Sequence, residues 1–214
     1  MTWTARSLLT LFTTFLTLWA SGGVYESNGA EDPQPAPTAA IGSLGEALPL
    51  SAAQSELVSA SFDRFSTAGM AAPTHVVPSF HDSIEACNGN LGLSTVEDGV
   101  ARVRVCWSHE DPMVELLLQE QALMHELAHA WAKINVDDAR RDAFVEFSGS
   151  ASWDLAADSW NARGTERAAD LVTWALLDPS VLFVDFDEMS CQTWAPAFEL
   201  LTSAPAPAQL SEAC

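Results

Sequence analysis

Basic residues are scarce in this sequence. Its 214 residues include 9 Lys and Arg against 29 Asp and Glu, which gives a formal net charge of −20 at pH 7. An acidic chain repels phosphate, and no stripe of Lys and Arg could follow a phosphate backbone, so nucleic-acid binding is excluded. The charge is typical of a solvated acidic surface; attraction of cationic substrates is the alternative interpretation.

A hydrophobic run long enough to span a membrane is also lacking. Residues 7–20 are apolar or hydroxylated throughout, but this run is shorter than the roughly 20 residues that a transmembrane helix needs. Arg6 precedes the run and the small residues ASGG end it, as in a secretory signal peptide. We therefore expect residues 1–22 to be a signal peptide, and the protein to be secreted or extracytoplasmic at the cell envelope, without stable membrane insertion after cleavage. An uncleaved signal that anchors the domain is the alternative.

Periodic apolar residues are missing from residues 23–50, which are rich in Gly, Ala, Pro, Ser and Glu. This composition predicts a disordered linker or stalk, with a propeptide as the alternative. The remaining residues 51–214 suit a single domain, and a hydrophobic content of 48% is enough to build a core.

Cysteines number only four, and no C-x-x-C pair is present, which disfavours a cysteine-based zinc site. In an exported chain four cysteines indicate two disulfides, for which the sequence permits three pairings. We favour Cys87 with Cys106 and Cys191 with Cys214, because each bridge closes a modest loop and ties down a segment that looks irregular.

The remaining sequence predicts an α+β fold, with a few strands followed mostly by helices. Alternation of Val and Arg over residues 100–107 indicates a strand with one buried face, and a shorter extended run precedes it near residues 74–83. Apolar periodicity and capping residues predict helices at 51–68, 111–135, 138–147, 166–177 and 191–203.

The longest predicted helix contains the stretch ALMHELAHAW, which places His125, Glu126 and His129 among apolar residues. Residues four apart lie on one helix face, so the two imidazoles can bind one zinc ion. Glu126 can then take a proton from a water held by the metal and pass it to a leaving amine. The alternative is a chance match at the edge of the core, but three unpaired buried polar groups would each cost about 1 to 3 kcal/mol.

In metzincins the motif continues as H-x-x-G-x-x-H, and its last histidine is the third metal ligand. Here Ala132 occupies the glycine position and Asn135 the histidine position, so the third ligand must lie elsewhere. Glu166 and Asp170 are better candidates, since they share one face of an otherwise apolar predicted helix. In this interpretation Glu166 ligates the metal and Asp170 accepts the free ring N–H of one histidine. The alternative is a solvated first turn in which acids are favoured by the helix dipole.

The motif HELAH with the downstream ExxAD resembles the gluzincin branch of the zincin-like metallopeptidases, in a small exported bacterial form. This resemblance implies a minimal zincin-like catalytic domain with His125, His129 and Glu166 as zinc ligands. It further implies Glu126 as general base and Asp170 as the acid that orients a liganding histidine. It also implies an edge strand that pairs with an extended peptide substrate, which we assign to residues 100–106.

The sequence departs from this family in one respect that concerns the oxyanion. Gluzincins commonly supply a Tyr or His there, but the only tyrosine, Tyr25, lies in the predicted linker. His81, His109 and Arg163 are substitutes, although each also fits an ordinary surface or turn position. Trp153 and Trp160 lie in an unfamiliar segment, where they either line a substrate cleft or pack in the core.

The function expected from these features is a zinc-dependent peptidase acting on a peptide or protein substrate. The alternative is a non-catalytic exported envelope or binding protein with a structural or vestigial zinc site, which is consistent with the missing tyrosine and the small size.

Overall fold

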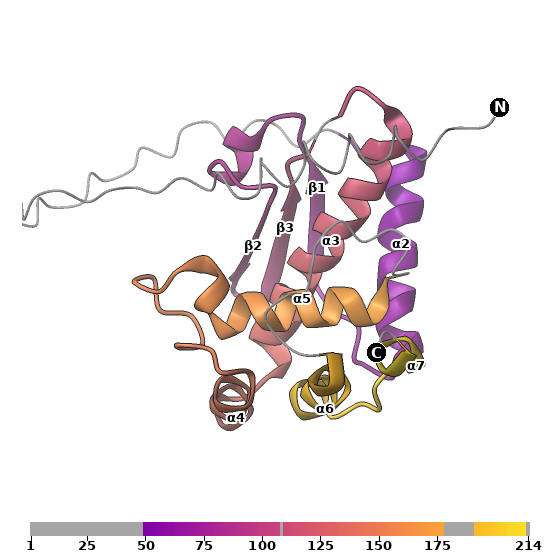
Figure 1. Ribbon diagram of the computed structural model, residues 1–214. Helices are drawn as coiled ribbons and strands as arrows, with labels where there is room; N and C mark the ends of the chain where they lie inside the picture. Colours follow the sequence, from indigo (N-terminus) through magenta and orange to yellow (C-terminus); the bar gives the residue numbers. More distant parts are fainter. Residues whose placement is uncertain (1–48, 108, 178–190, 213–214) are drawn as a thin grey trace, which may run out of the picture. The chain divides into compact units, whose positions relative to one another are not determined.

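The computed structural model describes residues 49–107, 109–177 and 191–212, and these belong to one compact unit, Ser43–Cys214. The elements form an α+β fold with a small sheet and several helices, which confirms the predicted fold class (Figure 1). The predicted signal peptide, and the predicted linker up to residue 48, lie outside the described residues. In chain order the elements are α2 (Ala52–Thr67), β1 (Val76–Phe80), η1 (Ile84–Cys87), β2 (Gly92–Glu97), β3 (Val100–Val105), α3 (Pro112–Asn135), α4 (Asp138–Ser148), η2 (Trp160–Ala162), α5 (Gly164–Leu176), α6 (Cys191–Thr202) and α7 (Ala208–Glu212).

The sheet has the strand order β1-β3-β2, with β1 parallel and β2 antiparallel to β3. In β3 the side chains of Ala101, Val103 and Val105 are fully buried, whereas Arg102 is exposed. This confirms the predicted alternation, which follows from the two-residue period of a strand. Helix α3 packs against β2 and β3 and contributes to the same core (Figure 1).

The assignment of residues 100–106 to an edge strand is wrong. Strand β3 pairs on both sides, and the two edges of the sheet are β1 and β2. Strand β2 was not predicted, because its sequence GLSTVE does not alternate apolar and polar residues; in the structure it is partly buried along most of its length. Its place in the sheet depends on pairing with β3, which a local pattern does not reveal.

Helix α3 begins and ends where its sequence predicts. The Asp111 side chain accepts a hydrogen bond from the Met113 N–H, Pro112 occupies the first turn, and Asn135 is the last helical residue. Leu123, Leu127 and many neighbouring residues are buried against the sheet and against α5, which crosses α3 (Figure 1). Within the described ranges, no helix combines the length and apolarity needed to cross a membrane.

The other predicted helices are also present as α2, α4, α5 and α6, with ends shifted by at most two residues. Asp137 caps α4 through the Arg140 N–H, and Gly149 ends that helix with a positive φ of 68°. Helix α7 was not predicted, because the alanine- and proline-rich sequence around it has the composition of a tail.

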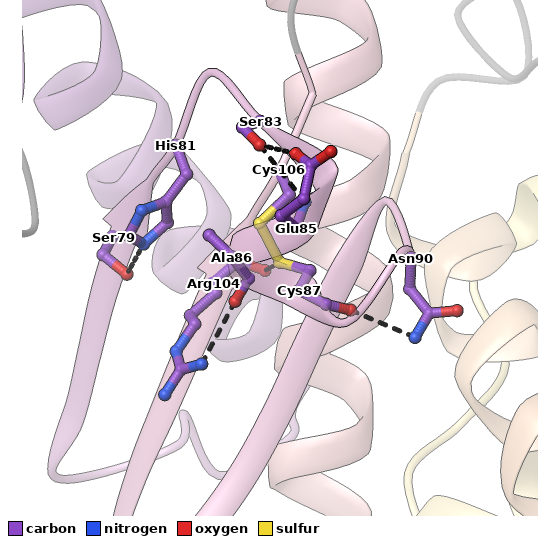
Figure 2. The surroundings of a disulfide bond; sticks show 9 residues. All are labelled: Ser79, His81, Ser83, Glu85, Ala86, Cys87, Asn90, Arg104 and Cys106. Atoms are coloured by element: carbon purple, nitrogen blue, oxygen red, sulfur yellow. Dashed lines mark hydrogen bonds between the residues drawn. A yellow bond between two sulfur atoms is a disulfide. The ribbon is translucent and has the colours of Figure 1, made fainter. Parts of the chain in front are cut away.

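The predicted bridge between Cys87 and Cys106 is confirmed (Figure 2). It joins η1 to the residue that follows β3, and both cysteines are buried. The surrounding backbone is held by Arg104, whose Nη1 donates to the Ala86 carbonyl at 3.1 Å, and by Asn90, whose Nδ2 donates to the Cys87 carbonyl at 3.1 Å. The other predicted bridge, between Cys191 and Cys214, lies outside the side chains that the structure describes.

Replacing both Cys87 and Cys106 by alanine is expected to lower the free energy of unfolding by about 3 kcal/mol, from the entropy of closing a loop of this length. The two residues are 19 apart in sequence, so the bridge restricts a short segment of the unfolded chain. Urea denaturation of the oxidised protein and the double variant measures the difference. An unchanged midpoint and slope would show that the bridge does not stabilise the fold.

Candidate metal centre

Helix α3 carries two histidines one turn apart, and their rings approach each other closely. The Nε2 atoms of His125 and His129 are 3.0 Å apart, and the ring planes are inclined by 81°. Both side chains are largely buried, at 19% and 16% exposure. Their spacing of four residues therefore places both imidazoles on one face, as predicted.

Helix α5 brings the third polar group from a distant part of the sequence. Glu166 lies in its first turn, and its Oε2 is 3.2 Å from the Nε2 of His125 and 3.2 Å from the Nε2 of His129. The ligand atoms of these three residues all lie within 4.8 Å of one another, so they could hold a metal ion. We call His125, His129 and Glu166 the ligand group.

The second nitrogen of each imidazole is also held. The Nδ1 of His125 is 2.9 Å from Oδ1 of Asp170, one turn after Glu166 on α5. The Nδ1 of His129 is 3.2 Å from Oγ1 of Thr165. Each ring therefore has its Nδ1 against a neighbour on α5 and its Nε2 directed into the ligand group, the arrangement that orients metal-binding histidines. Asp170 was predicted for this place; Thr165 was missed, because a threonine at a helix start has no distinctive pattern.

Charge in the ligand group is set by the contacts between its members. Burial raises the pKa of the Glu166 carboxyl, but hydrogen bonds from His125 and His129 outweigh burial and lower this pKa to about 2. Burial lowers the pKa of His125, but hydrogen bonds to Asp170 and Glu166 outweigh it and hold this pKa well above its usual value. The low pKa means that the Glu166 carboxylate is already ionised, and a bound cation would replace the proton on His125 that faces it.

Glu126 follows His125 on α3 but lies outside the ligand group. Its side chain is 7% exposed, and burial raises the pKa of its carboxyl, against the opposing charges of the two histidines. A Cβ placed on Gly92 of β2 would lie 2.6 Å from its Cγ and 2.8 Å from its Cδ. Gly92 has no positive φ, so glycine is required here for space. Sequence reasoning missed Gly92, whose contact with Glu126 exists only in the folded chain.

A cleft of about 330 Å³ opens beside these residues. Trp153 and Trp160 both line it, and Trp153 also packs against the core beside Phe144, so for Trp153 both predicted alternatives apply. The cleft also contains two basic side chains, Lys133 and Arg141, which no motif had singled out. The residues that line it are Asn90, Gly92, Leu93, Ser94, Glu126, His129, Lys133, Arg141, Trp153, Asp154, Trp160, Thr165 and Glu166.

The three residues considered for the oxyanion do not line this cleft. The Nε2 of His81 is 3.1 Å from Oγ of Ser79 on β1 (Figure 2). His109 accepts a hydrogen bond at its Nδ1 from the Asp111 N–H, before α3. Arg163 donates to two backbone carbonyls and packs over a tryptophan ring. These contacts match the ordinary surface and turn roles that were the alternative.

Comparisons with models of protein families, with curated proteins and with solved structures found no match to this chain.

Proposed function

We propose that this protein is a zinc-dependent peptidase. The observation that carries the proposal is the ligand group of two histidines and a glutamate, which opens on a cleft with the separate buried carboxyl of Glu126 beside it. This is the arrangement that the resemblance to gluzincins implies.

Zinc is the proposed metal because its usual ligands include imidazole nitrogens and carboxylate oxygens. Within the described ranges the ligand group has three members, and His129 and Glu166 line the cleft. Three protein ligands at an open position are typical of a catalytic zinc site, whereas structural sites are closed by a fourth. When bound, zinc supplies Lewis-acid chemistry: it polarises a carbonyl and makes a water more acidic.

Glu126 is the proposed general base. Burial raises its pKa, which brings the carboxyl closer to the range useful for proton transfer near neutral pH. It would take a proton from the attacking water and deliver it to the amine of the leaving peptide. Asp170 and Thr165 are positioning residues, since they touch His125 and His129 rather than the reacting atoms.

Strand β2 replaces β3 as the proposed docking edge for an extended substrate. Gly92, Leu93 and Ser94 of β2 line the cleft. The Cys106 N–H donates to the Leu91 carbonyl, and hydrogen-bonded pairs alternate along an antiparallel ladder. The backbone groups of Gly92 and Ser94 therefore point away from β3, where a peptide could pair with them.

The proposal is tested by incubating the zinc-loaded protein with a mixture of unstructured peptides and identifying products by mass spectrometry. We expect cleavage that a chelator abolishes and added zinc restores. A protein that binds one zinc per chain but cleaves none of the peptides would favour the alternative of a non-catalytic envelope or binding protein.

Replacing Gly92 by alanine is expected to leave zinc binding intact and reduce kcat for peptide hydrolysis by about tenfold or more, because misplacement by about 1 Å can cost a hundredfold. The new methyl group would occupy the space of the Glu126 side chain, whereas the ligand group lies outside this contact. Zinc content and kcat are measured on the same samples. Gly99, in the turn between β2 and β3, has no atom near its absent Cβ but has a positive φ of 76°, so Gly99→Asn, which tolerates this conformation, is the control for loss of a glycine outside the cleft. Equal kcat in Gly92→Ala and the wild type would contradict the assigned contact.

A further inference from the structure

Lys133 is the only lysine in a chain with few basic residues, and it lines the cleft of the metal centre. It follows His129 by four residues on α3, so it lies one turn further along the same helix face. Its side chain is exposed, and in the part of the chain that the structure describes it forms no ion pair.

A second cation, Arg141 of α4, is anchored against Lys133. Its Nη2 donates to the Lys133 carbonyl at 3.3 Å, and its guanidinium carbon lies 5.7 Å from the centre of the Trp153 ring. Its Nη1 is 3.0 Å from Oδ1 of Asp138, whose side chain is 94% exposed, so this ion pair is weak. The Nε of Arg141 is buried and finds no acceptor among the described residues.

Two basic side chains, Lys133 and Arg141, therefore line a cleft in an acidic protein. Outside the ligand group and Glu126, the acid that lines the cleft is Asp154, against the two cations Lys133 and Arg141. The net charge of −20 would repel an anion at a distance, so only this local arrangement favours one.

We propose that Lys133, supported by Arg141, binds a carboxylate of the peptide substrate next to the scissile bond. This inference rests on the proposed function, since it specifies which peptides the proposed peptidase would bind in this cleft. The carboxylate comes either from the free C-terminus of the peptide or from an Asp or Glu side chain. Trp153 and Trp160 provide the apolar wall of the same cleft.

Binding is measured by titration calorimetry on the full mature protein carrying Glu126→Gln and loaded with zinc. The probes are N-acetyl-Phe-Gly, its C-terminal amide, and N-acetyl-Phe-Glu amide. We expect at least one of the two probes with a carboxylate to bind about tenfold tighter than the neutral amide, as for a charged hydrogen bond. Preference for the first indicates recognition of the C-terminus, and preference for the third indicates recognition of an acidic side chain.

Lys133→Met in the same background is expected to remove this preference, and Lys133→Arg to retain most of it. Arg102→Met, an exposed cation on β3 outside the cleft, is the matched control and should leave the preference unchanged. Zinc is present in every protein variant, so binding of a probe carboxylate by the metal alone would contribute equally to the preference measured in each variant. Equal binding of the three probes, or a full preference in Lys133→Met, overturns the proposal.

These measurements detect binding and need no catalysis, so they test the role of Lys133 separately from the peptidase function. A carboxylate preference that depends on Lys133, in a protein that cleaves no peptide, contradicts only the peptidase function. Peptide cleavage without any preference for a carboxylate contradicts only the role of Lys133.

Discussion

Glu126→Gln is expected to retain zinc while kcat/KM for peptide hydrolysis falls by about 10² to 10⁴, the usual contribution of a general base. Glutamine has the same shape as glutamate and fits the same space beside Gly92, but its amide cannot accept the proton of the attacking water. The ligand group does not include Glu126, so the metal content should not change. Activity and zinc content are measured on the same preparation.

The matched control for this change is Glu146→Gln, which makes the same substitution at an exposed position of α4 outside the cleft. It should behave as the wild type. Equal activity of Glu126→Gln and the wild type would contradict the mechanism, and loss of zinc in Glu126→Gln would identify Glu126 as a ligand instead of a base.

Glu166→Ala is expected to abolish stable zinc binding, which elemental mass spectrometry measures after dialysis. The wild type should hold about one zinc per chain and the variant much less, because three protein ligands define a catalytic zinc site. Glu166 supplies the carboxylate oxygen that lies against both Nε2 atoms. Because this buried carboxylate also pairs with His125, the variant could lose its fold as well as a ligand. Circular dichroism of each variant, and the isosteric Glu166→Gln, distinguish these two effects.

Asp170→Asn provides a comparison for Glu166→Ala, because it is expected to weaken zinc binding less. Asp170 contacts only the Nδ1 of His125 in this cluster, and loss of such an orienting partner typically costs 10- to 100-fold in metal affinity. Asp170→Asn should therefore bind zinc more weakly than the wild type but more tightly than Glu166→Ala. Equal zinc retention by Glu166→Ala and the wild type would mean that the third ligand is another residue; a wild type without zinc would favour the binding-protein alternative.

Local patterns predicted the parts of the fold whose geometry repeats over a few residues. The alternation in residues 100–105 indicated a strand with one buried face, and Asp111 with Pro112 marked the start of α3. The spacing of His125 and His129 likewise implied that their rings share one face, because residues four apart on a helix always do. Glu166 and Asp170 were found by the same rule, applied to α5.

Contacts between distant segments were harder to predict. Strand β2 carries no clear periodicity, so the central position of β3 and the identity of the edge strand were missed. Gly92 has no feature that marks it as the neighbour of Glu126, and Lys133 and Arg141 carry no motif. These residues meet only because α3 packs on β2, and α4 follows α3 closely enough for Arg141 to reach the Lys133 carbonyl.

The amino-acid sequence was sufficient to specify two histidines on one helix face, a neighbouring carboxyl and a second helix with two acids, since each depends on a helical period of a few residues. Folding supplied the rest. It brought Glu166 to His125 across 41 residues, gave Glu126 its buried place against Gly92, and gathered two cations in the cleft. Such contacts depend on how whole elements pack against each other, which no short window of sequence encodes.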